Sequence, residues 1–297
     1  NEFTINADAV LNELSVDLDE QDKSTGDIVT QINEVVKSLE ELNTKEKEAA
    51  EAMQLKKTLE KAITSIERAN RDLHSLVWRR LNDTELEEET KNILDSIENV
   101  KHTTPKSIEV LESTEFVKYP AKEDVEAAMS ILLNQTNLKF SKKELKSLVE
   151  KNQKLQSLIT VTTNTWILNI EYLSGNKNTI TLIQKTASSS DNLSGVKFYE
   201  IIPKDIARDI NEIELLFDYE VVEEDPVVEI DISEIKGYAY YIKKRVSLED
   251  TEKTKSVLLS KDLKLEKKSF ITGLSVVDDL TSKIIDGSDK RLIIEIL

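Results

Sequence analysis

The fold is decided by residues 142–170, which read KKELKSLVEKNQKLQSLITVTTNTWILNI. In the first half of this stretch, Leu145, Leu148 and Val149 have the three- and four-residue spacing of one helix face. In the second half, Ile-Thr-Val-Thr and Trp-Ile-Leu-Asn-Ile are rich in the β-branched and aromatic residues that favour strands. The hydrophobic period therefore changes near Gln156. We predict an α+β chain, with helices before this point and strands after it.

Residues 1–154 are predicted to form a mainly helical domain, built as a hairpin or bundle. Two apolar stripes have the spacing of amphipathic helices. The first stripe consists of Ile28, Ile32, Val35, Leu39 and Leu42, and the second of Leu55, Leu59, Ala62, Ile66, Ala69, Leu73 and Leu76. The two stripes differ in phase, and Asn43 with Glu46 has the spacing of a capping box. We therefore place a helix break near Asn43.

The rest of the helical domain is expected to contain shorter elements. Thr84 and Glu87 have capping-box spacing and predict a third helix from about residue 84 to 99. A proline ends that helix, and alternating residues after it predict a short extended crossing near residues 106–119. Pro120 at a first helical position, and later a Ser141–Glu144 capping box, predict two more helices.

Residues 155–248 are predicted to form a β-sandwich domain. Short apolar runs separated by turn residues indicate about seven strands, a spacing typical of an immunoglobulin-like or fibronectin-like sandwich. A short mixed tail, residues 249–297, follows the sandwich. Its apolar hexamer Leu292–Leu297 is predicted to be a final strand.

The composition excludes several classes of function. The chain contains 40 Lys+Arg against 57 Asp+Glu, and its net charge of -17 repels nucleic-acid backbones. There is no cysteine and only two histidines, which excludes thiolate catalysis, cysteine-ligated metals and histidine-rich metal sites. No apolar run approaches the roughly 20 residues that span a bilayer. We therefore expect no nucleic-acid partner, no cofactor, no metal and no membrane span in this chain.

Part of the predicted sandwich resembles a known class of module. The segments FYEIIPKDIA (residues 198–207), EDPVV (residues 224–228) and YYIKK (residues 240–244) are similar to β-sandwich modules of poorly characterised archaeal cell-surface proteins. Those modules share a pattern of Ile-Pro-Lys followed by Ala and, later, Asp-Pro. The resemblance implies an extracellular helical part, then the sandwich, then a C-terminal membrane anchor, which would lie outside this chain.

Two groups of residues are candidates for binding a protein partner. The first is the helical stripe Ile28, Ile32, Val35 and Leu39, whose spacing suits a coiled coil or self-association. The second is Trp78, Arg79 and Arg80, near which His74 also lies. The alternatives are that the stripe packs within the chain, and that the Trp-Arg-Arg group covers the end of the helical hairpin.

Three asparagines, Asn82, Asn134 and Asn192, stand in N-x-[ST] sequences and are acceptors for glycosylation if the protein is exported. Asp17, Asp19 and Gln21 resemble the start of a calcium loop, but Asp22 and Ile28 occupy the positions of its glycine and closing glutamate. We predict no metal site there. The acidic runs Asp278–Asp279 and Glu223–Asp225 are interpreted as solvated turns rather than as catalytic carboxylates.

No nucleophile in the sequence stands in a G-x-S-x-G or comparable catalytic motif, and we predict that the protein is not an enzyme. The leading hypothesis is a structural or adhesion-type protein exposed on the cell surface. The alternative is a cytoplasmic scaffold or regulator that binds a partner through its amphipathic helices.

Overall fold

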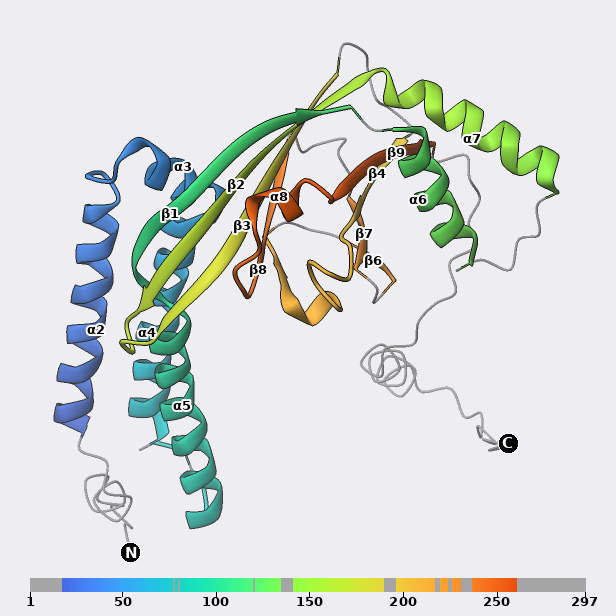
Figure 1. Cartoon of the computed structure of the whole chain (residues 1–297). Helices are drawn as coiled ribbons and strands as arrows, with labels where there is room; N and C mark the ends of the chain where they lie inside the picture. Colours follow the sequence, from blue (N-terminus) through green and yellow to red (C-terminus); the bar gives the residue numbers. More distant parts are fainter. Residues whose placement is uncertain are drawn as a thin grey trace, which may run out of the picture.

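The part of the chain that the structure describes forms four layers: a layer of N-terminal helices, a five-stranded sheet, a four-stranded sheet and a further pair of helices (Figure 1). The computed structural model describes residues 18–76, 78–79, 81–119, 121–134, 141–189, 196–216, 220–223, 226–230 and 237–260. Both sheets are antiparallel throughout. The predicted α+β class, with N-terminal helices followed by antiparallel sheets, is confirmed.

From residue 18 onward, the described helices of the N-terminal layer are α2 (Leu18–Ser38), α3 (Thr44–Ala52), α4 (Leu55–Leu76) and α5 (Asp83–Thr103). The break predicted near Asn43 is confirmed, because Asn43 caps α3 and forms a reciprocal capping box with Glu46. The box predicted at Thr84 and Glu87 was wrong: Asn82 and Glu85 cap α5 instead. Both pairs have the same spacing, and the asparagine side chain is the stronger N-cap acceptor.

The five-stranded sheet has the order β1-β2-β3-β8-β5. Its strands are β1 (Pro105–Lys118), β2 (Ile159–Tyr172), β3 (Lys177–Ser189), β8 (Gly237–Ile242) and β5 (Ile213–Leu215). The extended crossing expected near residues 106–119 is therefore a strand of 14 residues, paired with β2 along its length. A hydrogen-bonded sheet thus joins residues on both sides of the boundary expected near residue 154.

The four-stranded sheet has the order β6-β7-β4-β9. Its strands are β6 (Glu220–Glu223), β7 (Val227–Ile230), β4 (Val196–Ile201) and β9 (Lys255–Ser260). An apolar core that includes Phe198, Val228 and Leu258 of this sheet and Ile183 and Tyr240 of the other fills the space between them. The two sheets therefore pack face to face as a sandwich.

The strand order differs from the one expected. In an immunoglobulin-like sandwich the second and third strands lie in opposite sheets, whereas here β1, β2 and β3 are neighbours in one sheet. Long strands joined by a tight turn at Gly175 explain this, because a hairpin keeps consecutive strands in one sheet.

Helices α6 (Lys122–Asn134) and α7 (Lys142–Gln156) cover the outer face of the four-stranded sheet, on the far side from the N-terminal helices (Figure 1). Val125, Ala128 and Met129 of α6 are buried there against Val257 and Leu259. The Ser141–Glu144 capping box predicted for α7 is confirmed. These two helices thus belong to the sandwich by packing, although they precede β2 in the sequence.

The described part of the tail contains the short helix α8 (Leu248–Thr251) and strand β9. The final strand predicted at residues 292–297 lies outside the described residues. Among the residues that the structure describes, no helix has the length and apolar character that crossing a membrane requires.

Candidate functional site: a lysine and a glutamate buried between the sheets

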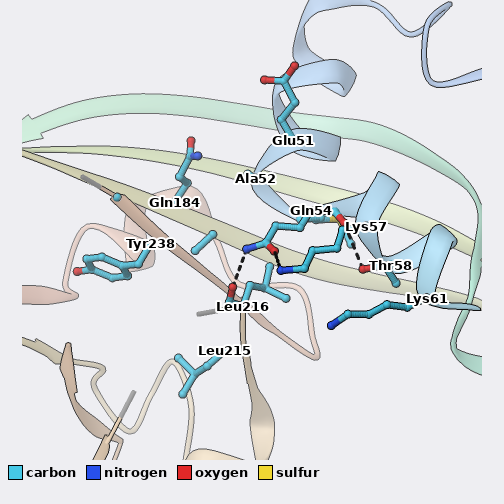
Figure 2. Close-up of a pocket in the computed structure, with 13 residues that line it drawn as sticks. Glu51, Ala52, Gln54, Lys57, Thr58, Lys61, Gln184, Leu215, Leu216 and Tyr238 are labelled. Carbon is cyan, nitrogen blue, oxygen red and sulfur yellow. Dashed lines mark hydrogen bonds between the residues drawn. The ribbon is translucent and has the colours of Figure 1, made fainter. Parts of the chain in front are cut away.

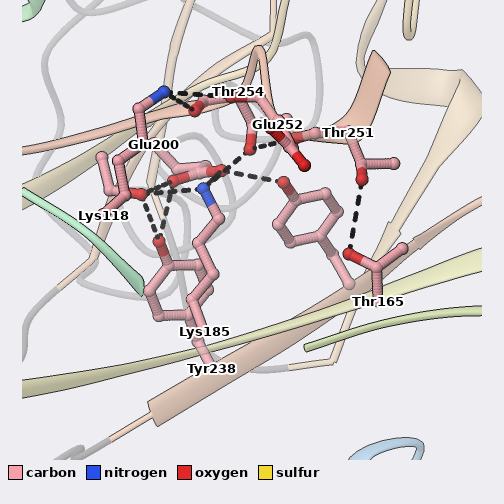
Figure 3. Close-up of polar contacts among 10 residues, drawn as sticks. Lys118, Thr165, Lys185, Glu200, Tyr238, Thr251, Glu252 and Thr254 are labelled. Atoms are coloured by element: carbon pink, nitrogen blue, oxygen red, sulfur yellow. Dashed lines mark hydrogen bonds and ion pairs between the residues drawn. The ribbon is translucent and has the colours of Figure 1, made fainter. Parts of the chain in front are cut away.

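Lys185 of β3 and Glu200 of β4 face each other across the interior of the sandwich (Figure 3). The Lys185 Nζ lies 2.6 Å from the Glu200 Oε1, and the two side chains are 2% and 0% exposed. The strand period explains why both side chains point inward. Lys185 is two residues after the core residue Ile183, and Glu200 is two residues after Phe198. The site thus contains one charged group from each sheet.

The neighbouring strands supply a shell of hydroxyl groups. Tyr238 lies directly opposite Lys185 in the β3–β8 register, and Ser256 lies opposite Glu200 in the β4–β9 register. The hydroxyls of Tyr238 and Ser256 donate to Glu200 Oε2 over 2.8 and 2.6 Å, and that of Tyr240 donates to Oε1 over 2.8 Å. The Glu200 carboxylate therefore accepts from three hydroxyls in addition to the ammonium.

The Lys185 ammonium is equally well satisfied. It donates to the hydroxyl oxygens of Thr254, over 2.9 Å, and of Ser256, over 2.8 Å, in addition to Glu200. An ammonium has three protons to donate, so each one has an acceptor. Buried charges persist in proteins only when they are paired and hydrogen-bonded in this way.

Burial shifts the proton affinities of the cluster. It lowers the pKa of Lys185, while the charge of Glu200 acts in the opposite direction. Burial, followed by the charge of Glu200, raises the pKa values of Tyr238 and Tyr240 well above their ordinary value. The tyrosines therefore remain protonated hydrogen-bond donors, and the lysine amine is easier to deprotonate than one in water.

Among the residues that the structure describes, the free space beside Lys185 is small. A cavity of about 10 Å³ lies beside Lys185, lined by residues that include Phe116, Lys118, Asp124 and Thr163. That is about the minimum volume for a single water molecule. Asp124 is held by the Lys255 ammonium at 2.9 Å, and Lys118 donates to the Glu252 carbonyl over 3.0 Å. This cavity has no room for a substrate larger than water.

A larger groove lies on the surface between the N-terminal helices and the edge of the five-stranded sheet (Figure 2). Its volume is about 630 Å³. Gln54, which has the left-handed backbone angle φ = 51°, bridges its two walls by donating to the Leu216 carbonyl over 2.8 Å. The charged residues that line it are Glu51, Lys57 and Lys61.

A second, more apolar groove of about 650 Å³ lies on the N-terminal helices, lined by residues that include Val36, Leu39, Ala50 and Leu55. Of the stripe proposed to bind a partner, Ile28, Ile32 and Val35 are buried in the helical core. This burial is what packing within the chain predicts. Leu39 is partly buried and lines the groove.

The second proposed partner group lies at the end of the helical layer. Trp78 is 85% exposed, and the Arg79 guanidinium pairs with Glu89 at 2.8 Å. Arg80 lies outside the described residues. The His74 ring contacts the Asp22 carboxylate at 2.7 Å.

Of the three predicted glycosylation acceptors, the structure describes the side chain of Asn82. Asn82 is exposed, and its side chain accepts from the Glu85 amide as the cap of α5. The side chain of Asn134 and the whole of Asn192 lie outside the described residues. Asp19 and Gln21, considered for a calcium loop, lie in the first turns of α2. Within the described ranges, no group of three or more potential ligands is placed to hold a metal ion.

Neither Lys185 nor Glu200 was predicted from the sequence to be a site residue. The signal was present, because each is a charged residue at an inward position of an alternating strand. Comparisons with protein-family models, with curated proteins and with solved structures find no match.

Proposed function

We propose that the protein is a non-enzymatic structural or adhesion-type protein of the cell surface, in which the sandwich is a rigid module. The observation that carries this proposal is the Lys185–Glu200 cluster, which is satisfied by its own neighbours and enclosed between the sheets. Such a cluster fixes one sheet against the other. The likeness of residues 198–207 to modules of archaeal cell-surface proteins supports the extracellular location.

The helical layer would then act as a spacer for the sandwich or as a docking surface for a partner protein. Trp78 supports this role, because an exposed tryptophan at the end of a helix pair is the type of residue that anchors protein interfaces. Asn82 lies close by in the sequence and is exposed, which suits a glycan acceptor on an exported protein. The partner is expected to be a protein or a second copy of the chain.

Digestion of intact cells tests the location. Cells that produce the full-length protein are treated with an external protease, and fragments of the chain are followed together with a cytoplasmic control protein. The proposal predicts that the chain is cut while the control survives. A chain that is cut only after lysis contradicts a surface location and favours the alternative below.

The second candidate function is a cytoplasmic scaffold or regulator. The apolar groove lined by Val36, Leu39, Ala50 and Leu55 favours it, because grooves of this kind accept an amphipathic helix. Replacing Leu39 by Glu should abolish binding of a partner or self-association through the groove. Replacing Gln31 by Glu adds the same charge at an exposed position of α2 outside the groove lining and is the control. Light scattering that shows a monomer for all three proteins, with no captured partner, contradicts this candidate.

A further inference from the structure

We propose that Lys185 and Glu200 condense into an intramolecular amide bond that joins β3 of one sheet to β4 of the other. The two groups that must react are already in contact, with Nζ 2.6 Å from Oε1. Each belongs to a strand that is paired on both sides, β3 with β2 and β8, and β4 with β7 and β9. Rigid placement of this kind replaces a bimolecular encounter by an effectively unimolecular step.

The surroundings favour condensation over hydrolysis. The side chains are 2% and 0% exposed, and the adjacent cavity of about 10 Å³ has room for about one water molecule. Amide formation releases one water, which leaves for the solvent and does not return at bulk concentration. The lack of water also activates the Lys185 amine, because a desolvated lysine is a better nucleophile than one in water.

The hydroxyl groups around Glu200 are placed to assist the reaction. Tyr238 and Ser256 donate to one carboxyl oxygen and Tyr240 donates to the other. Attack on the carboxyl carbon places negative charge on these same oxygens, and fixed donors stabilise such charge. Burial lowers the pKa of Lys185, which increases the share of neutral amine.

The reaction balances without another reagent. A proton passes from the Lys185 ammonium to the Glu200 carboxylate and leaves a neutral amine and a carboxylic acid. Nζ then attacks the carboxyl carbon Cδ to form the C–N bond. The C–O bond of the hydroxyl breaks, and the oxygen leaves as water with a second proton from Nζ. The amide retains one N–H, and nothing is oxidised or reduced.

The mass of the intact, purified full chain tests this inference. A bonded chain is lighter than the mass calculated from its sequence by one water molecule. Trypsin localises the bond, because modified Lys185 resists cleavage. The bonded chain yields a branched peptide of residues 178–197 and 198–204, whereas an unbonded chain yields 178–185, 186–197 and 198–204 as separate peptides.

Two variants serve as controls. Lys185→Arg preserves the positive charge but removes the amine, and should have its full calculated mass. Lys197→Arg changes the lysine of the partly exposed Lys197–Glu229 pair and should still lose one water. The inference is overturned if the wild-type chain has its full mass and gives the separate peptides, or if Lys185→Arg still loses water. The wild-type peptides decide the matter even if a variant does not fold.

This inference does not depend on the compartment proposed above, since the cluster is closed to solvent wherever the chain resides. Failure to find the bond would leave the protease test of location unaffected. A positive result would add a covalent tie between the sheets, which suits a protein under mechanical load.

Discussion

Replacing Lys185 by Met removes the ammonium from the cluster and keeps an unbranched chain of similar length. Glu200 would then be a fully buried carboxylate that still accepts from Tyr238, Tyr240 and Ser256. Loss of one partner from a buried ion pair reduces the free energy of unfolding by about 3–5 kcal/mol. If the amide bond forms, the wild-type chain has no ion pair to lose; the variant then lacks a covalent tie that contributes about 3 kcal/mol for a closed loop of about 15 residues, and Glu200 is still left as an unpaired buried carboxylate. The total stability of a typical domain is only about 5–15 kcal/mol.

The variant Glu200→Leu provides the matched comparison, because it also prevents the amide bond. It leaves Lys185 as a buried cation and deprives three hydroxyl donors of their acceptor. One buried unsatisfied donor lowers stability by about 1–3 kcal/mol, so Glu200→Leu should be less stable than Lys185→Met by at least that amount. Any difference between the two variants is independent of the covalent bond.

Unfolding in urea measures both variants. Trp166 is 3% exposed in the core and reports on unfolding by its fluorescence, and a Trp78→Phe background removes the signal of the exposed tryptophan. The reasoning is refuted if Lys185→Met loses less than about 1 kcal/mol, which is the size for a solvent-exposed pair. It is also refuted if Glu200→Leu is as stable as Lys185→Met.

Three further outcomes are expected. The Gln156 side chain accepts from the Leu258 amide over 3.0 Å and donates to the Leu258 carbonyl over 2.6 Å. Replacing Gln156 by Ala should therefore lower the free energy of unfolding by about 1–3 kcal/mol and speed hydrogen exchange of the Leu258 amide. Gly175→Ala should destabilise the chain by about 1 kcal/mol, because the backbone angle φ is +83° there. Gly26→Ala, at an exposed position inside α2, should stabilise it by about 0.5–1 kcal/mol. Thermal unfolding distinguishes the two signs. The folded state holds protons on Tyr238 and Tyr240 that the unfolded state loses above pH 10.0, so these two groups should make stability fall as the pH rises above that value. Phenolate absorbance should show that they ionise only on unfolding.

The N-terminal helices were the most predictable part of the fold. The stripe from Leu55 to Leu76 has the bounds of α4, because one face of this helix packs against the rest of the layer and keeps a regular period. The start of α2 at Leu18 was not predicted, since its first turns have few buried residues. Periodicity reports on burial, and a helix segment without a buried face gives little signal.

Strand β1 was predicted only as a short extended crossing near residues 106–119, for two physical reasons. It lies at the edge of its sheet and contains Glu109, Glu112 and Glu115, so that few of its positions are buried. An irregularity between Val110 and Glu112 also shifts the alternation by one residue. Strands β5 and β6 follow each other closely in the sequence but lie in different sheets, and which sheet a short apolar run joins depends on tertiary pairing.

The cluster itself depends on contacts between residues far apart in the sequence. Lys185 and Ser256 are 71 positions apart, and Tyr240 and Glu200 are 40 apart. An inward lysine on one strand and an inward glutamate on another were visible in the alternation. Their pairing required the register of four strands, which no local pattern specifies.

The central claim is that Lys185 and Glu200 tie the two sheets together in a cluster closed to solvent. Acylation of the native protein with an amine-specific reagent, read by peptide mapping, tests it most directly. Lys185 should remain unmodified under conditions that modify Lys197, whose side chain is 31% exposed. Modification of Lys185 in the folded protein at a rate similar to that of Lys197 would contradict the account.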